Sequence, residues 1–142
     1  MQVNEKDLAY LYDMYVYSLE IEDFVKNMKY IEYEKNKHNR WIVERLLITV
    51  GEAANRITKE AQQEFQSIPW RRIINLRNVL AHDYGDIKSE KMWNVAKEGI
   101  PELLEELLKI EDLKELIDTH KNEPKIIPRQ NRRRPLLPLS IQ

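Results

Sequence analysis

The chain has 142 residues, a length typical of one domain. A domain of this size can bury a hydrophobic core without the help of disulfides or bound metal. It has no cysteine, which excludes a disulfide framework, a thiolate nucleophile and cysteine-bound zinc or iron–sulfur sites. The net charge is −1, but residues 119–142 hold six Lys or Arg and one acid, so an acidic body precedes a basic tail.

A first helix is predicted from about Glu5 to Tyr33. Its apolar residues recur mostly at three- and four-residue steps, the pattern of one buried helix face, and Asn4 is suited to cap it. A polar stretch, residues 34–39, is expected to end this helix. Glycine is scarce, and this composition favours helices over hairpins throughout the chain.

A second helix is predicted from about Asn39 to Phe65, again from its apolar stripe. Gly51 and the small residues beside it would let another helix approach closely. Glu52 and Arg56 are four residues apart, the favourable order for an ion pair on a helix surface.

A third helix is predicted from about Trp70 to Asp83, with Gly85 placed to stop it in a conformation that glycine tolerates. A fourth begins near Ser89. A fifth starts at Pro101, a residue suited to the first helical turn, and reaches as far as Leu116. The expected fold class is therefore all-α, an up-and-down bundle of four to five helices.

After Thr119 the helical pattern ends, and four prolines forbid a continuous helix. We therefore expect a helical domain over residues 1–118 and a flexible, basic, proline-rich tail over residues 119–142. The tail holds a cluster that could attract RNA or simply be solvated: Arg132, Arg133 and Arg134.

Several kinds of site have no signal in the sequence. There is no His-Glu-x-x-His motif, no calcium-binding aspartate spacing, no P-loop and no Gly-x-Gly-x-x-Gly motif, so neither a metal nor a cofactor is expected. The first ten residues carry charges where a secretory signal needs an apolar run, and no stretch approaches the ~18 apolar residues of a membrane span. We expect a cytoplasmic protein without a membrane partner.

One segment, RNVLAHDY from Arg77 to Tyr84, gathers polar groups of several kinds on the third helix. Asn78 and His82 are four residues apart and share a face. Arg77 and His82 are about 140° apart around the axis, and the long arginine side chain can still bring both polar groups to one end of the helix.

These groups suit RNA cleavage by the RNA's own 2′-hydroxyl. Histidine is the natural base near neutral pH, guanidinium matches the phosphate, and the tethered nucleophile needs no metal. Asn78 could orient His82 or donate to a phosphate oxygen. On spacing alone, however, structural roles are more frequent than catalytic ones. A histidine cation near the C-terminal end of a helix is stabilised by the helix dipole, and most arginines are surface or ion-pair residues.

The identities of the residues in this segment carry more information than their spacing alone. RNVLAHDY resembles the Arg-x4-His-x-Tyr motif of the HepT toxins of the HEPN superfamily, over a match from about Leu8 to Leu108. Further segments agree with the family in order: Glu44-Arg45, Val50-Gly51-Glu52-Ala53-Ala54, Ile68-Pro69-Trp70, Trp93 and Pro101-Glu102-Leu103. The basic tail lies outside the shared pattern.

The resemblance implies a helical bundle that forms a homodimer, in which the two motif helices build one cleft. It implies a toxin that cleaves tRNA or mRNA without metal, with Arg77 and His82 catalytic and Asn78 supporting. It also implies a partner, the MntA-like nucleotidyltransferase antitoxin, which transfers AMP to the motif tyrosine, here Tyr84. A larger toxin–antitoxin hetero-oligomer is left open.

A second class of function remains open at this point. Some helical domains of the superfamily are non-catalytic binding modules that accompany a minimal nucleotidyltransferase. The intact Arg77 and His82 pair favours the enzyme, because a pure scaffold has no use for a base. A structural dimerisation module is a third reading, but it leaves the polar cluster unexplained.

Overall fold

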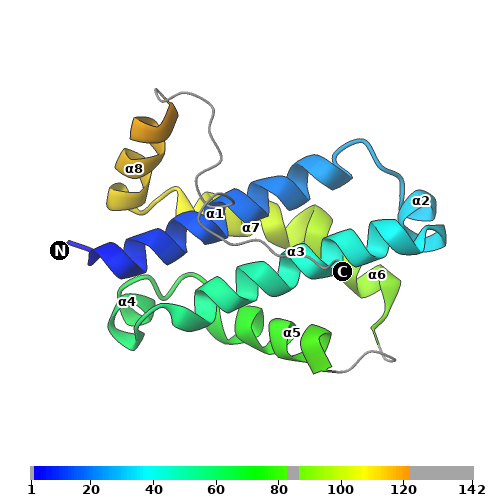
Figure 1. The fold of residues 1–142 in the computed structure, drawn as a ribbon, viewed down its shortest axis with the longest axis horizontal. Coiled ribbons are helices and arrows are strands. Elements are labelled where there is room, and N and C mark those ends of the chain that lie inside the picture. The colour runs from blue at the N-terminus through cyan, green and yellow to red at the C-terminus, as the bar shows by residue number, and fades with distance from the viewer. Residues whose placement is uncertain (1, 83–86, 122–142) are drawn as a thin grey trace, which may run out of the picture.

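Three long helices form the body of the protein in a computed structural model, which describes residues 2–82 and 87–121. These helices are α1 (Glu5–Val25), α3 (Lys37–Arg56) and α5 (Trp70–His82), and α3 packs between the other two (Figure 1). They run in alternating directions (Figure 1). Every regular element in the described ranges is helical, which confirms the all-α fold class.

The remaining elements are shorter. They are α2 (Tyr30–Lys35), α4 (Lys59–Glu64), α6 (Ser89–Asn94), a π-helical turn (Val95–Gly99), α7 (Ile100–Leu107) and α8 (Glu111–Lys121). The described residues thus form eight α-helical segments, more than the four to five expected. The segment from α6 through the π turn to α7 has no break, and α7 packs on α1.

The first predicted helix is divided in two. Instead of running to Tyr33, α1 ends at Val25, and Lys29 has an extended backbone with φ −94° and ψ 155°. The Lys29 N–H donates to the Glu32 carboxylate at 2.8 Å, which caps the start of α2. The prediction of one helix was wrong here, and part of the expected polar break is helical, since α2 extends to Lys35.

The second predicted helix is also divided, between α3 and α4. Thr58 caps α4 by accepting from the Ala61 N–H, and its own N–H and hydroxyl donate to the buried Asp7 carboxylate at 2.9 and 2.6 Å. Asp7 lies 51 positions earlier, at the start of α1. The bonds tie two helix starts together and explain why the chain leaves the helix at Ile57.

The predicted fifth helix is interrupted as well. Between α7 and α8 the chain turns at the buried Ile110, and α8 then ends at Lys121. The rest of the predicted tail, residues 122–142, lies outside the described residues. In the described part, no helix combines the length and the apolar character needed to cross a membrane.

Candidate functional site

The candidate site is carried by α5, the one helix whose predicted range agrees closely with the structure. Pro69 precedes it, and the buried Trp70 begins it, with the indole N–H donating to the Phe65 carbonyl at 3.1 Å. Leu80 is buried and anchors the other end of the helix. Helix α5 packs on α3, and the motif residues Arg77, Asn78 and His82 all lie on this helix.

Gly51 sets how closely α5 approaches α3. A Cβ atom added to Gly51 would lie 2.2 Å from the Arg77 Cβ, 2.9 Å from its Cγ and 3.3 Å from the Ile73 carbonyl oxygen. No side chain fits there without moving the helix. The expectation that Gly51 permits close helix contact is confirmed, and the helix that approaches is the one that carries the motif.

Arg77 is held from two sides. Its Nη1 donates to the Asn78 side-chain oxygen at 2.9 Å, and its Nη2 lies 3.6 Å from the Glu52 carboxylate. Its Nε is buried and has no hydrogen-bond partner in the described part of the chain. The side chain as a whole is still 27% exposed, so part of this positioned cation is accessible from solvent.

His82 is the last residue of α5 and is exposed, as is Asn78 one turn earlier on the same face. It lies about 7.5 Å along the axis from Arg77. Among residues 2–82 and 87–121, no hydrogen bond joins His82 to Arg77 or to Asn78, whose oxygen is used by Arg77 instead. The described residues therefore do not bond the three groups into a triad.

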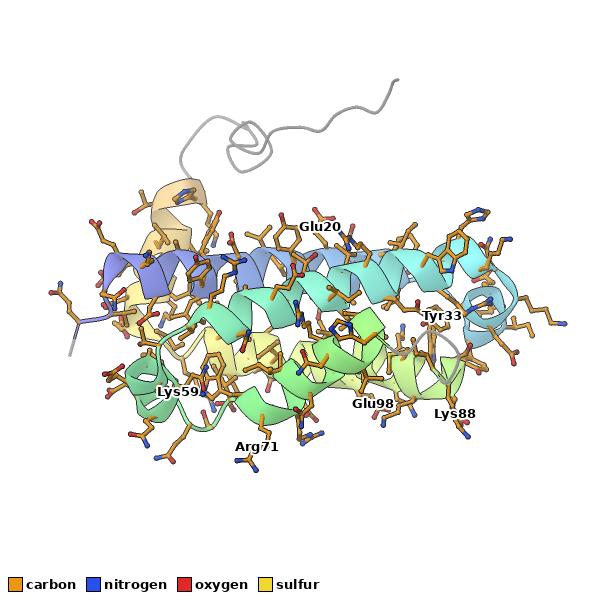
Figure 2. The ribbon with its side chains drawn as sticks, turned by 60° about the horizontal axis from the view of Figure 1, so that its bottom comes forward. Glu20, Tyr33, Lys59, Arg71, Lys88 and Glu98 are labelled. Carbon is orange, nitrogen blue, oxygen red and sulfur yellow. The ribbon has the colours of Figure 1, made fainter. Side chains whose placement is uncertain are left out.

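An apolar groove of about 820 Å³ runs beside the motif helix, between α5 and the α6–α7 segment. Val79, on the α5 side, is 45% exposed although it is apolar. The apolar lining includes Ile73, Leu76, Met92, Val95 and Leu103. Not every arginine of α5 belongs to the site, because Arg71 points away from the bundle into solvent (Figure 2).

Two parts of the predicted site lie outside the described residues: Tyr84, and the cluster of Arg132, Arg133 and Arg134. Sequence reasoning missed the partner of Arg77, since the spacing suggested that Glu52 pairs with Arg56. The signal that could have found it was Gly51, whose helix contact brings its neighbour Glu52 next to α5. Among the residues described, no group of three or more His, Asp or Glu could hold a metal ion.

Comparison with known proteins places the chain in a family. The family model "Ribonuclease HepT-like" matches residues 14–110. "Putative RNase MJ1380" of Methanocaldococcus jannaschii is 33% identical over 70% of this chain and 91% of its own length. "Putative RNase MJ1216" of the same organism is 36% identical over 72% of this chain and 84% of its own length.

A third relative carries the family name itself. "Probable ribonuclease HepT" of Thermococcus cleftensis is 30% identical over 58% of this chain and 76% of its own length. No solved structure matches the chain. The matched region of the family model spans the packed helices from α1 to α7 and includes the whole motif helix. The chain belongs to the HepT-like ribonuclease family.

Proposed function

We propose that the protein is the toxin of a toxin–antitoxin pair and cleaves RNA without a metal ion, using Arg77 and His82. The observation that carries the proposal is the environment of the Arg77 guanidinium. It is held beside Gly51 and Glu52, remains partly exposed, and lies on the same helix as an exposed histidine. This arrangement is suited to an anionic substrate next to a base.

In the proposed reaction His82 removes the proton of a 2′-hydroxyl, and the resulting oxygen attacks the adjacent phosphorus. The bond from phosphorus to the 5′-oxygen breaks, and that oxygen takes up a proton. The products are a 2′,3′-cyclic phosphate and a 5′-hydroxyl. Arg77 stabilises the charge that grows on the phosphate oxygens, and the Asn78 amide can add a further donor.

A second copy of the chain completes the proposed site. Val79 and the groove beside α5 leave apolar surface next to the motif, and a twofold axis there would bring two Arg77 and His82 sets together. The second histidine could then supply the leaving oxygen with its proton. The cluster of Arg132, Arg133 and Arg134 would add RNA affinity that does not depend on sequence and weakens with salt.

The dimer predicts a sedimentation result. At micromolar concentration the wild-type chain should sediment as a dimer, and Val79→Glu should sediment as a monomer and lose cleavage, since a charge would be buried at the contact. Glu98→Lys, a change on the exposed surface of the π turn outside the groove, is the matched control and should stay dimeric. A monomeric wild type would contradict a shared cleft.

Regulation is proposed to act at Tyr84. A partner nucleotidyltransferase of the MntA type would transfer AMP from ATP to the phenol oxygen, with pyrophosphate leaving. The added phosphate would pair with Arg77, and the nucleotide would occupy the space of the RNA. Both effects block substrate without unfolding the chain.

The modification predicts a mass change. Mixed with the partner and ATP, wild type should gain one or more AMP units by intact-mass measurement, and Tyr84→Phe should gain none. Expressed alone, wild type should arrest growth, and co-expression of the partner should relieve the arrest. An equal mass gain on Tyr84→Phe would remove Tyr84 from the proposal, whereas absence of toxicity would count against the toxin assignment.

A further inference from the structure

A tryptophan stands exposed near the start of α3. Trp41 is 56% exposed, whereas Trp70 is only 7% exposed. The Lys37 ammonium lies 5.4 Å from the centre of the Trp41 ring, and the His38 ring meets it edge-on, with 5.4 Å between ring centres. Large aromatic side chains usually gain their stability from burial, so a ring oriented by its neighbours but left open to solvent suggests a binding role.

Trp41 belongs to a row of residues along α3. The row consists of Lys37, Trp41, Arg45 and Glu52, here called the α3 stripe. Its members lie within about 80° of one another around the helix, since each residue turns by about 100°. The Glu52 end of the stripe is in contact with Arg77. The Trp41 end is about 16 Å away along the axis, at about 1.5 Å for each residue.

The direction of the helices places His82 toward the Trp41 end of the stripe. Helices α3 and α5 run antiparallel (Figure 1). Gly51 meets α5 at Ile73 and Arg77. From this contact, α5 continues toward His82 while α3 leads back toward Arg45 and Trp41. A strand bound at Arg77 and His82 that continues in this direction along α3 therefore reaches Arg45 and then Trp41.

The charge of the stripe favours RNA over protein as the occupant. Arg45 and Lys37 are exposed and form no ion pair with any residue that the structure describes. Protein interfaces are depleted of lysine at their centres, whereas surfaces for single-stranded nucleic acid combine cations for the backbone with aromatic rings for the bases. Stacking on a ring is available to every base, so such a contact tolerates any sequence.

We propose that Trp41, flanked by Lys37 and Arg45, is a subsite on which an unpaired base of a single-stranded RNA stacks while the RNA backbone is held at Arg77. The inference rests on the proposed ribonuclease function and extends it. It assigns the substrate as single-stranded at that position, because a paired base has no free face to offer. Trp41 acts in binding and touches no reacting atom.

The test uses the full chain and a 2′-O-methyl octanucleotide of mixed sequence, which lacks the nucleophile and so stays intact. The oligonucleotide should quench the wild-type tryptophan fluorescence on binding. Trp41→Ala should lose that quenching and bind about tenfold more weakly, while Trp41→Phe should keep most of the affinity. Ile42→Ala, which alters the neighbouring exposed apolar residue, is the matched control and should bind like wild type.

The cations can be tested in the same assay. Arg45→Gln should lower the slope of log affinity against log salt by about 0.7, the value of one contact to a single-stranded phosphate. Arg56→Gln, at the other end of α3, should leave the slope unchanged. Equal affinity of Trp41→Ala and wild type would overturn the subsite, as would failure of wild type to bind the oligonucleotide.

Two further results separate this proposal from others. A loss of the dimer in Trp41→Ala would show that the ring contacts protein, which also overturns the subsite. Quenching that depends on Trp41, in a protein that cleaves no RNA, would leave the subsite standing and remove the proposed ribonuclease function instead. If wild type cleaved total RNA but Trp41→Ala had no effect on binding, the ribonuclease function would stand and the Trp41 subsite would be removed.

Discussion

Replacing His82 with alanine should lower the rate of RNA cleavage by about 10² to 10⁴, the range that a general base contributes. Arg77→Ala should lower it by about 10² to 10³, since one charged donor to the phosphate is lost. His82 is exposed, so its replacement should change the free energy of unfolding by no more than about 0.5 kcal/mol. The measurements are initial cleavage rates and urea unfolding of each variant.

The control for charge is Arg71→Ala, which removes an arginine of the same helix that points away from the site (Figure 2). It should cleave at the wild-type rate. If His82→Ala also cleaved at that rate, His82 would not be the base, and the assignment of the chemistry to α5 would fail.

Gly51→Ala should damage the site through the helix contact alone. The new Cβ would lie 2.2 Å from the Arg77 Cβ, and because that atom is fixed to the backbone, α3 and α5 must move apart. Overpacking of this kind costs about 1–3 kcal/mol of unfolding free energy. A displacement of Arg77 by about 1 Å should cost about 10² in cleavage rate.

Gly99→Ala is the matched control, since the nearest side-chain atom to the new Cβ would be Val95 Cγ1 at 3.9 Å. Within a helix, alanine is more favourable than glycine by about 0.5–1 kcal/mol, so this variant should be as stable as wild type or more so. A Gly51→Ala protein with wild-type stability and activity would show that the close contact does not position Arg77.

The motif helix could be predicted from the sequence because its signals are local. Its apolar residues repeat with helical spacing, and Pro69 precedes its first turn. The same holds for the all-α class and for the close approach at Gly51. The sequence signal for each of these features lies in residues within a few positions of one another, although the partner of Gly51 on α5 is more distant in the chain.

The helix breaks could not be predicted in the same way. Thr58 caps α4, and its N–H and hydroxyl donate to Asp7, 51 positions earlier. The periodicity of the sequence carries no information about such a contact. Likewise Glu52 pairs with Arg77 on another helix, although Arg56 has the better spacing within its own helix. Long-range packing decided both cases.

The most direct test of the account is to incubate the purified wild-type chain with total RNA in excess EDTA and to determine the new ends. Cleavage with 2′,3′-cyclic phosphate and 5′-hydroxyl ends, absent from His82→Ala, is the result expected of a base, a cation and a tethered nucleophile. Intact RNA in EDTA, with cleavage restored by added Mg²⁺ or Mn²⁺, would contradict the metal-independent mechanism. RNA left intact under every condition would favour a helical binding module that accompanies a nucleotidyltransferase.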